Sequence, residues 1–318
     1  MKTLTRITVL GLATLPLASA WAAPFGYSVN ADGGDHLFRI DLANGATTDI
    51  GLVQSLGTTR SDIEGMAFAP DGTLWAADDE SRQLFPITLA NAQVDFQREV
   101  TISGLGASAG NDFGMAFNCD SDLFMASVAD QSLYSVELDG TATLIGNMGV
   151  RISALAIVGD GYPDFRLYGL GNGLADDQGT PDNRSLYEID PTTGAATLVG
   201  AVGAAVDAYY EAGLSFDENG NLWAITDRSP DAEGSQVLQL DTNTGAATVV
   251  STTTEIGFES LAVSPPAQCP QIGTPPPDPP PGTPPAAYEG IPTLDVWGRA
   301  IGTIGLLLLG LAAIRRRY

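Results

Sequence analysis

Histidine is nearly absent from this chain of 318 residues, whose single histidine is His36. Zinc sites built from several histidines are therefore excluded. A Ser-His-Asp triad would have to use His36, which ends the Gly-Gly-Asp-His segment at residues 33–36. We interpret His36 as a solvated loop residue, and the sequence offers no histidine-based catalytic site.

Basic residues are scarce as well. The chain has 14 Lys and Arg against 38 Asp and Glu, and its formal net charge is −24. The only lysine, Lys2, and five arginines lie near the two ends, so the body between them is more acidic still. A surface of this sign repels phosphate backbones and anionic lipids, which excludes nucleic acid as a partner. Calcium, cationic groups and neutral glycans remain as partners, and a high net charge also favours solubility.

Long hydrophobic runs occur only near the two ends. At the N-terminus, Lys2 and Arg6 precede the apolar run 7–17, and small residues follow it. This order is typical of a secretory signal peptide. We predict a signal peptide at residues 1–22, with cleavage after Ala22 and with Ala20 as the alternative, and therefore export through the inner membrane.

The second apolar run, residues 300–314, is followed by Arg315-Arg316-Arg317. Fifteen helical residues span roughly 22 Å, which is less than the roughly 30 Å of a hydrocarbon core. Arg299 can snorkel and Trp297 can lie in the interface, which lengthens the segment. We predict a transmembrane segment at 300–314 whose terminal arginines stay in the cytoplasm, so that the body lies outside.

An eight-residue string precedes this run, Ile-Pro-Thr-Leu-Asp-Val-Trp-Gly at residues 291–298. It resembles the sorting signal of the IPTL-CTERM family. The fixed positions of that signal are all matched, by Ile291, Pro292, Thr293, Leu294, Trp297 and Gly298. The resemblance covers the tail, residues 291–318. It implies a Gram-negative bacterium, a transient membrane anchor, cleavage by an exosortase-type processing enzyme and a final place at the cell surface or outside the cell. An anchor that is never cut is the alternative.

Proline is concentrated just before this tail, with eleven of the 20 prolines between residues 265 and 285. Such a segment favours the stiff, extended polyproline conformation. We predict a proline-rich linker at residues 265–290, which would hold the body away from the membrane.

The body, residues 24–264, repeats a pattern of short strands. One recurring unit places small residues beside buried apolar ones, and its five copies lie at residues 64–68, 113–117, 153–157, 212–216 and 259–263. Another unit carries Leu37, Leu84, Leu133, Leu186 and Val237 at equivalent positions, about 50 residues apart. Turn pairs such as Asp139-Gly140 and Thr244-Gly245 join the strands. Four antiparallel strands in each period of about 50 residues indicate a blade of a β-propeller.

Five copies predict an all-β ring of five four-stranded blades, with six blades as the alternative. Residues 25–29 look like a second strand that lacks its first strand. We therefore expect the C-terminal strand near Leu261 to pair beside the strand near Tyr27, which would close the ring without a free edge.

The chain has two cysteines, Cys119 and Cys269, and neither lies in a C-x-x-C or metal-ligand spacing. An exported protein can keep a disulfide. Both cysteines follow predicted first strands, and residues 265–268 can lead the chain back beneath the ring. We predict a Cys119–Cys269 disulfide, with two free thiols as the alternative.

Acidic residues are frequent at one predicted face of the ring. Those just before first strands are Asp62, Glu64, Asp112, Asp207, Glu211 and Glu259, and those between second and third strands include Asp79 and Asp227. Carboxylates that converge from several blades can bind a hard cation such as Ca²⁺, which takes six to eight oxygen ligands. The candidate ligands are Glu64, Asp79, Glu211, Asp227 and Glu259. The alternative is that these acids cap turns and solvate loops.

The body also resembles the calcium-dependent lactonase propellers of the gluconolactonase type, in which Glu64, Asp79, Glu211 and Asp227 would hold comparable places. Two departures are that the copies number five rather than six and that a convincing set of Asn and Asp ligands is lacking. More generally, the repeats resemble those of uncharacterised secreted propeller proteins.

Tyr209 and Tyr210 precede a predicted first strand on the same face. Their rings could stack against a sugar or a peptide, or could close the top of the core. The sequence thus favours a non-catalytic, surface-displayed propeller that binds an extracellular polysaccharide or a surface protein. The alternatives are a calcium-dependent lactonase or hydrolase and a structural protein of the surface matrix.

Overall fold

The computed structural model describes residues 24–30, 35–106, 112–159, 164–174, 180–228 and 232–264, together with Pro266 and Cys269. All regular elements in these ranges are β-strands, and in this part of the chain we find no helix suited to crossing a membrane. The predicted signal peptide and the sorting signal at residues 291–318 lie outside the described residues, as does the proline-rich linker apart from Pro266 and Cys269.

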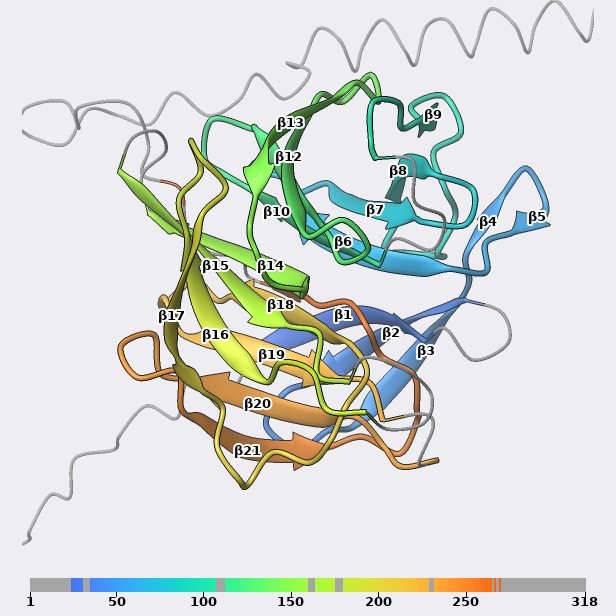
Figure 1. Ribbon diagram of the computed structural model, residues 1–318. Coiled ribbons are helices and arrows are strands. Elements are labelled where there is room, and N and C mark those ends of the chain that lie inside the picture. The colour runs from blue at the N-terminus through green and yellow to red at the C-terminus, as the bar shows by residue number, and fades with distance from the viewer. Residues whose placement is uncertain are drawn as a thin grey trace, which may run out of the picture. The chain divides into compact units, whose positions relative to one another are not determined.

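The described strands form five four-stranded antiparallel sheets in a ring (Figure 1). Four of these blades are built from consecutive strands. The second blade of the ring consists of β6 (Ile63–Phe68), β7 (Leu74–Asp78), β8 (Gln83–Ile87) and β9 (Val100–Thr101), and the third of β10 (Phe113–Phe117), β11 (Leu123–Ser127), β12 (Ser132–Val136) and β13 (Ala142–Asn147). The fourth consists of β14 (Ile152–Gly159), β15 (Phe165–Gly171), β16 (Ser185–Ile189) and β17 (Ala196–Ala201), and the fifth of β18 (Ala212–Phe216), β19 (Leu222–Thr226), β20 (Gln236–Leu240) and β21 (Ala247–Thr252). The predicted five-bladed propeller is confirmed, and the six-bladed alternative is wrong for the described chain.

The closing blade joins the two ends of the body. It consists of β22 (Ala262–Ser264), β1 (Phe25–Asn30), β2 (His36–Asp41) and β3 (Thr47–Leu52), in that order across the sheet. Tyr27 lies opposite Ala262, and Phe25 lies opposite Ser264. The Ser28 hydroxyl adds a bond to the carbonyl of Ser260 at 2.5 Å. The predicted pairing of the strand near Leu261 with the strand near Tyr27 is therefore present. A small hairpin of β4 (Gln54–Ser55) and β5 (Thr58–Thr59) lies outside the blades.

A disulfide between Cys119 and Cys269 fastens the chain beyond β22. Cys119 lies in the turn between β10 and β11, and its Cα is 5.3 Å from that of Cys269. The bond connects residues 150 positions apart, and neither cysteine is free. The disulfide predicted from the sequence is therefore present. It joins the segment that follows β22 of the closing blade to the β10–β11 turn of another blade.

The first strands of the blades surround the axis of the ring. Contacts run from β6 to β10, from β10 to β14, from β14 to β18, from β18 to β22 and from β22 back to β6. Because all blades repeat one topology about this axis, their first strands begin at the same end of the ring. Residues that precede or open these strands are therefore brought together from different parts of the sequence.

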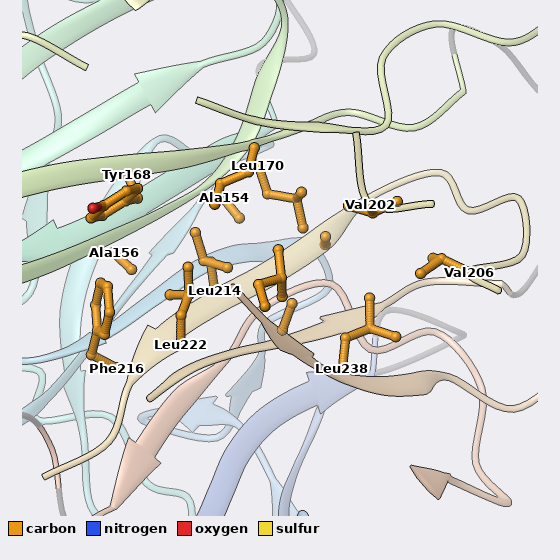
Figure 2. Close-up of a cluster of buried hydrophobic side chains, with 14 of the residues drawn as sticks. Ala154, Ala156, Tyr168, Leu170, Val202, Val206, Leu214, Phe216, Leu222 and Leu238 are labelled. Carbon is orange, nitrogen blue, oxygen red and sulfur yellow. The ribbon is translucent and has the colours of Figure 1, made fainter. Parts of the chain in front are cut away.

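Hydrophobic side chains fill the space between neighbouring blades. Figure 2 shows the cluster between the blade of β14–β17 and the blade of β18–β21, where Leu170 and Tyr168 of one blade face Leu214, Phe216 and Leu238 of the next. Near the axis the strands approach so closely that small residues are needed. A Cβ on Gly213 would lie 2.2 Å from the backbone nitrogen of Leu261.

Candidate cation site at the ring axis

Three glutamates from three blades meet where the first strands begin. Glu64 lies in β6, Glu211 directly precedes β18, and Glu259 lies just before β22. One carboxylate oxygen of each residue lies within 4.8 Å of the others. Only closure of the ring can produce this group, because the three residues belong to the second, fifth and closing blades. We call it the axial trio.

A second group of three carboxylates lies within one blade. Asp62, Glu64 and Asp79 also have oxygens within 4.8 Å of one another. The backbone N–H of Asp79 donates to the carbonyl of Asp62 at 3.0 Å, which fixes these two residues opposite each other. We call this group the blade trio. Glu64 belongs to both trios.

Glu64 owes its position to a β-bulge in β6. Ile63 pairs with Asp78 and Gly65 pairs with Ala77, so Glu64 has no partner on β7. A bulge of this kind bends the strand and re-aims the extra side chain. The result is a carboxylate placed among the other acids with only 8% of its residue exposed.

Burial shifts the protonation of the whole group. It is the largest cause that raises the pKa of Glu64 to about 7 and that of Asp79 to about 10. The pKa values of Glu211 and Glu259 are raised well above the usual range by burial and then by the charge of Glu64. Burial likewise raises the pKa of Asp112. The positive charge of Arg151 offsets part of this rise. At neutral pH and without a cation, several of these groups must therefore keep a proton.

Some of these oxygens have no hydrogen-bond partner. Glu64 Oε2, Asp79 Oδ1 and Glu259 Oε2 are buried, and among the described residues they have no hydrogen-bond partner other than the neighbouring carboxyl groups. Buried polar atoms normally have partners, and an unpaired one requires an explanation such as an ion. All candidate ligands are carboxylates, without nitrogen or sulfur. This set of donors suits Ca²⁺, which prefers oxygens at 2.3–2.6 Å, better than Zn²⁺, which takes nitrogen and sulfur.

Four of the five ligands predicted from the sequence, Glu64, Asp79, Glu211 and Glu259, are brought together in the trios. Asp227 lies beside them, since its charge raises the pKa of Glu259 and its residue is 2% exposed.

Asp62 and Asp112 also precede first strands, but they are not among the ligands that the sequence predicts. The signal that identifies them is positional. In each of three blades, the backbone N–H of the residue just after the second strand donates to the carbonyl of the acid just before the first strand. The pairs are Asp79 with Asp62, Val128 with Asp112, and Asp227 with Glu211, so Asp62, Asp112 and Glu211 occupy equivalent places in their blades.

For Tyr209 the structure agrees with the second of the two alternatives, in which the ring closes the core, and not with a stacking role. Its residue is fully buried, and its hydroxyl donates to the carbonyl of Gly171 at 3.1 Å. The ring fills the core between two blades, so it offers no face to a ligand. Tyr210 is half-buried and keeps a partly open position. Its backbone N–H donates to Asp227, which places it near the edge of the site.

His36 lies apart from both trios. It is the first residue of β2 rather than a loop residue, and its Nδ1 lies 3.0 Å from Asp49 Oδ2. The side chain is 39% exposed. The histidine thus forms an ion pair at the surface when it is protonated.

Comparisons with known proteins do not identify a family for this chain. No family model matches the chain, and no curated protein matches it in sequence. A protein of unknown function from Bacteroides caccae is 10% identical, with a TM-score of 0.46 over 76% of this chain and 99% of that one. Virginiamycin B lyase from Staphylococcus aureus is 16% identical, with a TM-score of 0.39 over 71% of this chain and 69% of that one. Glutaminyl cyclase from Myxococcus xanthus is 16% identical, with a TM-score of 0.43 over 60% of this chain and 70% of that one. Likenesses this distant carry no argument for a function.

Proposed function

We propose that this protein is an exported, surface-displayed propeller that acts as a binding module and holds a divalent cation, calcium, at its axis. The observation that carries the cation is the axial trio, in which one oxygen of Glu64, Glu211 and Glu259 lies within 4.8 Å of the others. A cation at this point would neutralise carboxylates that otherwise need protons. It would also connect the first strands of three blades, including the closing one.

The binding face follows from the same geometry. In a propeller, loops at the end where first strands begin present their side chains around the axis, and a bound Ca²⁺ with open coordination positions can accept oxygens of a ligand. Hydroxyl and carboxylate oxygens of an extracellular polysaccharide or of a surface protein would fit this role. The net charge of −24 opposes a phosphate-rich partner.

Calcium binding is tested by titration calorimetry on the purified protein after removal of cations with EDTA. We expect Ca²⁺ to bind and a double variant, Glu211→Gln with Glu259→Gln, to lose most of that binding, because glutamine keeps the shape but not the charge. The matched control is Asp139→Asn, an exposed turn residue whose Oδ1 accepts a hydrogen bond from the backbone N–H of Thr141 at 2.9 Å, a bond that the asparagine Oδ1 can also accept. Unchanged binding in the double variant, or none in the parent, would remove calcium from the proposal.

The route to the surface is the second part of the proposal. It is supported by the apolar run 300–314, by the arginines after it and by the match to the Ile291–Gly298 signal. We expect mass spectrometry of protein taken from the cell surface to find a C-terminus near residues 291–298. Changing Trp297 to alanine should leave uncut protein in the membrane. Recovery of intact Tyr318 from surface material would instead identify a permanent anchor.

A calcium-dependent lactonase or hydrolase is the second candidate. The observation that favours it is the pKa of Glu64, raised by burial to about 7, because a carboxyl group in this range can exchange protons near neutral pH. The discriminating assay is hydrolysis of simple lactones with and without Ca²⁺. Hydrolysis that requires Ca²⁺ and is lost in the Glu64→Gln variant would favour the enzyme over the binding module.

A further inference from the structure

We infer that the axis takes two cations rather than one, with Glu64 as the ligand that bridges them. The inference rests on the proposed calcium binding and specifies its stoichiometry. One position is the axial trio of Glu64, Glu211 and Glu259, and the other is the blade trio of Asp62, Glu64 and Asp79.

The distances support two positions. Oxygens that bind the same Ca²⁺ at 2.3–2.6 Å lie at most about 5 Å apart. The three oxygens of each trio satisfy this limit, being within 4.8 Å of one another. Only Glu64 is common to both groups, and a carboxylate has two oxygens with which to reach two ions. Its Oε2 is buried, and among the described residues it has no hydrogen-bond partner other than the neighbouring carboxyl groups, so it is available as a ligand.

The charge of the cluster also exceeds what one ion can neutralise. The acids in the trios or coupled to them are Asp62, Glu64, Asp79, Asp112, Glu211, Asp227 and Glu259. The positive charge of Arg151 lowers the pKa of Asp112, but Arg151 also forms an ion pair with Asp182 at 3.6 Å, so its charge is shared between two acids. A single divalent cation supplies two positive charges, so most of the remaining acids would still need a proton in this buried place. Two divalent cations would neutralise a majority of them.

The two positions differ in what they connect. Asp62 and Asp79 are held opposite each other by a backbone hydrogen bond within one blade, so the blade trio does not depend on ring closure. The axial trio draws on β6, on the start of β18 and on the segment before β22. An ion in the axial trio therefore stabilises the closed ring, whereas an ion in the blade trio stabilises one blade.

The experiment counts ions in single variants of the full protein. Titration calorimetry with Ca²⁺ after EDTA treatment should give two ions per chain for the parent and for the exposed control Asp139→Asn. Asp79→Asn should leave one ion, and Glu259→Gln should leave one ion. Glu64→Gln should weaken the binding of both ions and raise each Kd by about tenfold or more. Melting measured in parallel should show that Glu259→Gln loses more of the calcium-dependent rise in Tm than Asp79→Asn does.

The outcomes separate this inference from the proposed function. Absence of calcium binding in the parent overturns both. One ion per chain in the parent, removed by Glu259→Gln, keeps the proposed function and overturns the second position. Loss of all binding in both Asp79→Asn and Glu259→Gln shows a single shared site and likewise overturns the inference. Two ions, with one lost in each of these variants, support it.

Discussion

Replacement of Gly213 by alanine is expected to destabilise the ring by about 3 kcal/mol. Gly213 lies in β18 at the point where the closing segment packs against it. A Cβ there would lie 2.2 Å from the backbone nitrogen of Leu261 and 2.2 Å from the carbonyl carbon of Ser260. Backbone atoms cannot move aside as the end of a side chain can, so β22 must shift and its pairing with β1 must weaken. Calorimetry should show a Tm lower by roughly 6–12 °C, since each kcal/mol shifts a domain of this size by about 2–4 °C.

Gly26→Ala is the matched control, because it also meets Leu261. Its Cβ would lie 2.7 Å from Leu261 Cδ1 and 3.0 Å from Leu42 Cδ2, both at the ends of flexible side chains. These ends can change rotamer, so we expect a cost of roughly 1 kcal/mol. Equal melting temperatures for the two variants would show that the closing segment does not pack tightly against β18.

The fold was predictable because its signals are local and repeated. Each blade repeats the same order of apolar strands and glycine turns, so a period of about 50 residues identifies both the number of blades and the closure at Leu261 and Tyr27. The unit that forms the first strands places small residues beside buried apolar ones. The distances around Gly213 give the physical reason, since neighbouring strands leave no room for a Cβ.

The site was only partly predictable, because it depends on details that do not repeat. Glu64 is aimed at the axis by a bulge, which the sequence does not mark. Asp62 and Asp112 resemble many acids that precede strands, and only their backbone partners show that they are equivalent to Glu211. Tyr209 and Tyr210 are adjacent and identical in type, yet one is fully buried and the other is half-buried. Which neighbour enters the core depends on the turn before β18 rather than on composition.

The second large effect concerns pH and calcium together. Without a cation, we expect the ring to be less stable at pH 8 than at pH 5. Burial raises the pKa of Glu64 from 4.5 to about 7, and it also raises those of Glu211 and Glu259. The folded state then binds more protons than the unfolded chain between about pH 4.5 and 7, so stability falls as pH rises through this window. Glu64 alone would contribute roughly 3 kcal/mol. Asp35, whose pKa burial raises to about 7, acts in the same direction.

Calcium should reverse this trend, because it replaces the protons. At a hundred times its Kd, a single bound ion adds about 2.7 kcal/mol, so the Tm at pH 8 should rise by roughly 5–11 °C, with little change at pH 5. Acids whose pKa is lowered, such as Glu188 beside Arg166, titrate below this window and do not obscure it. Glu211→Gln tests the cause, since the amide cannot ionise. The variant should be more stable than the parent at pH 8 in EDTA and should gain less from calcium. A parent whose Tm in EDTA rises from pH 5 to pH 8 would contradict the buried carboxylate cluster.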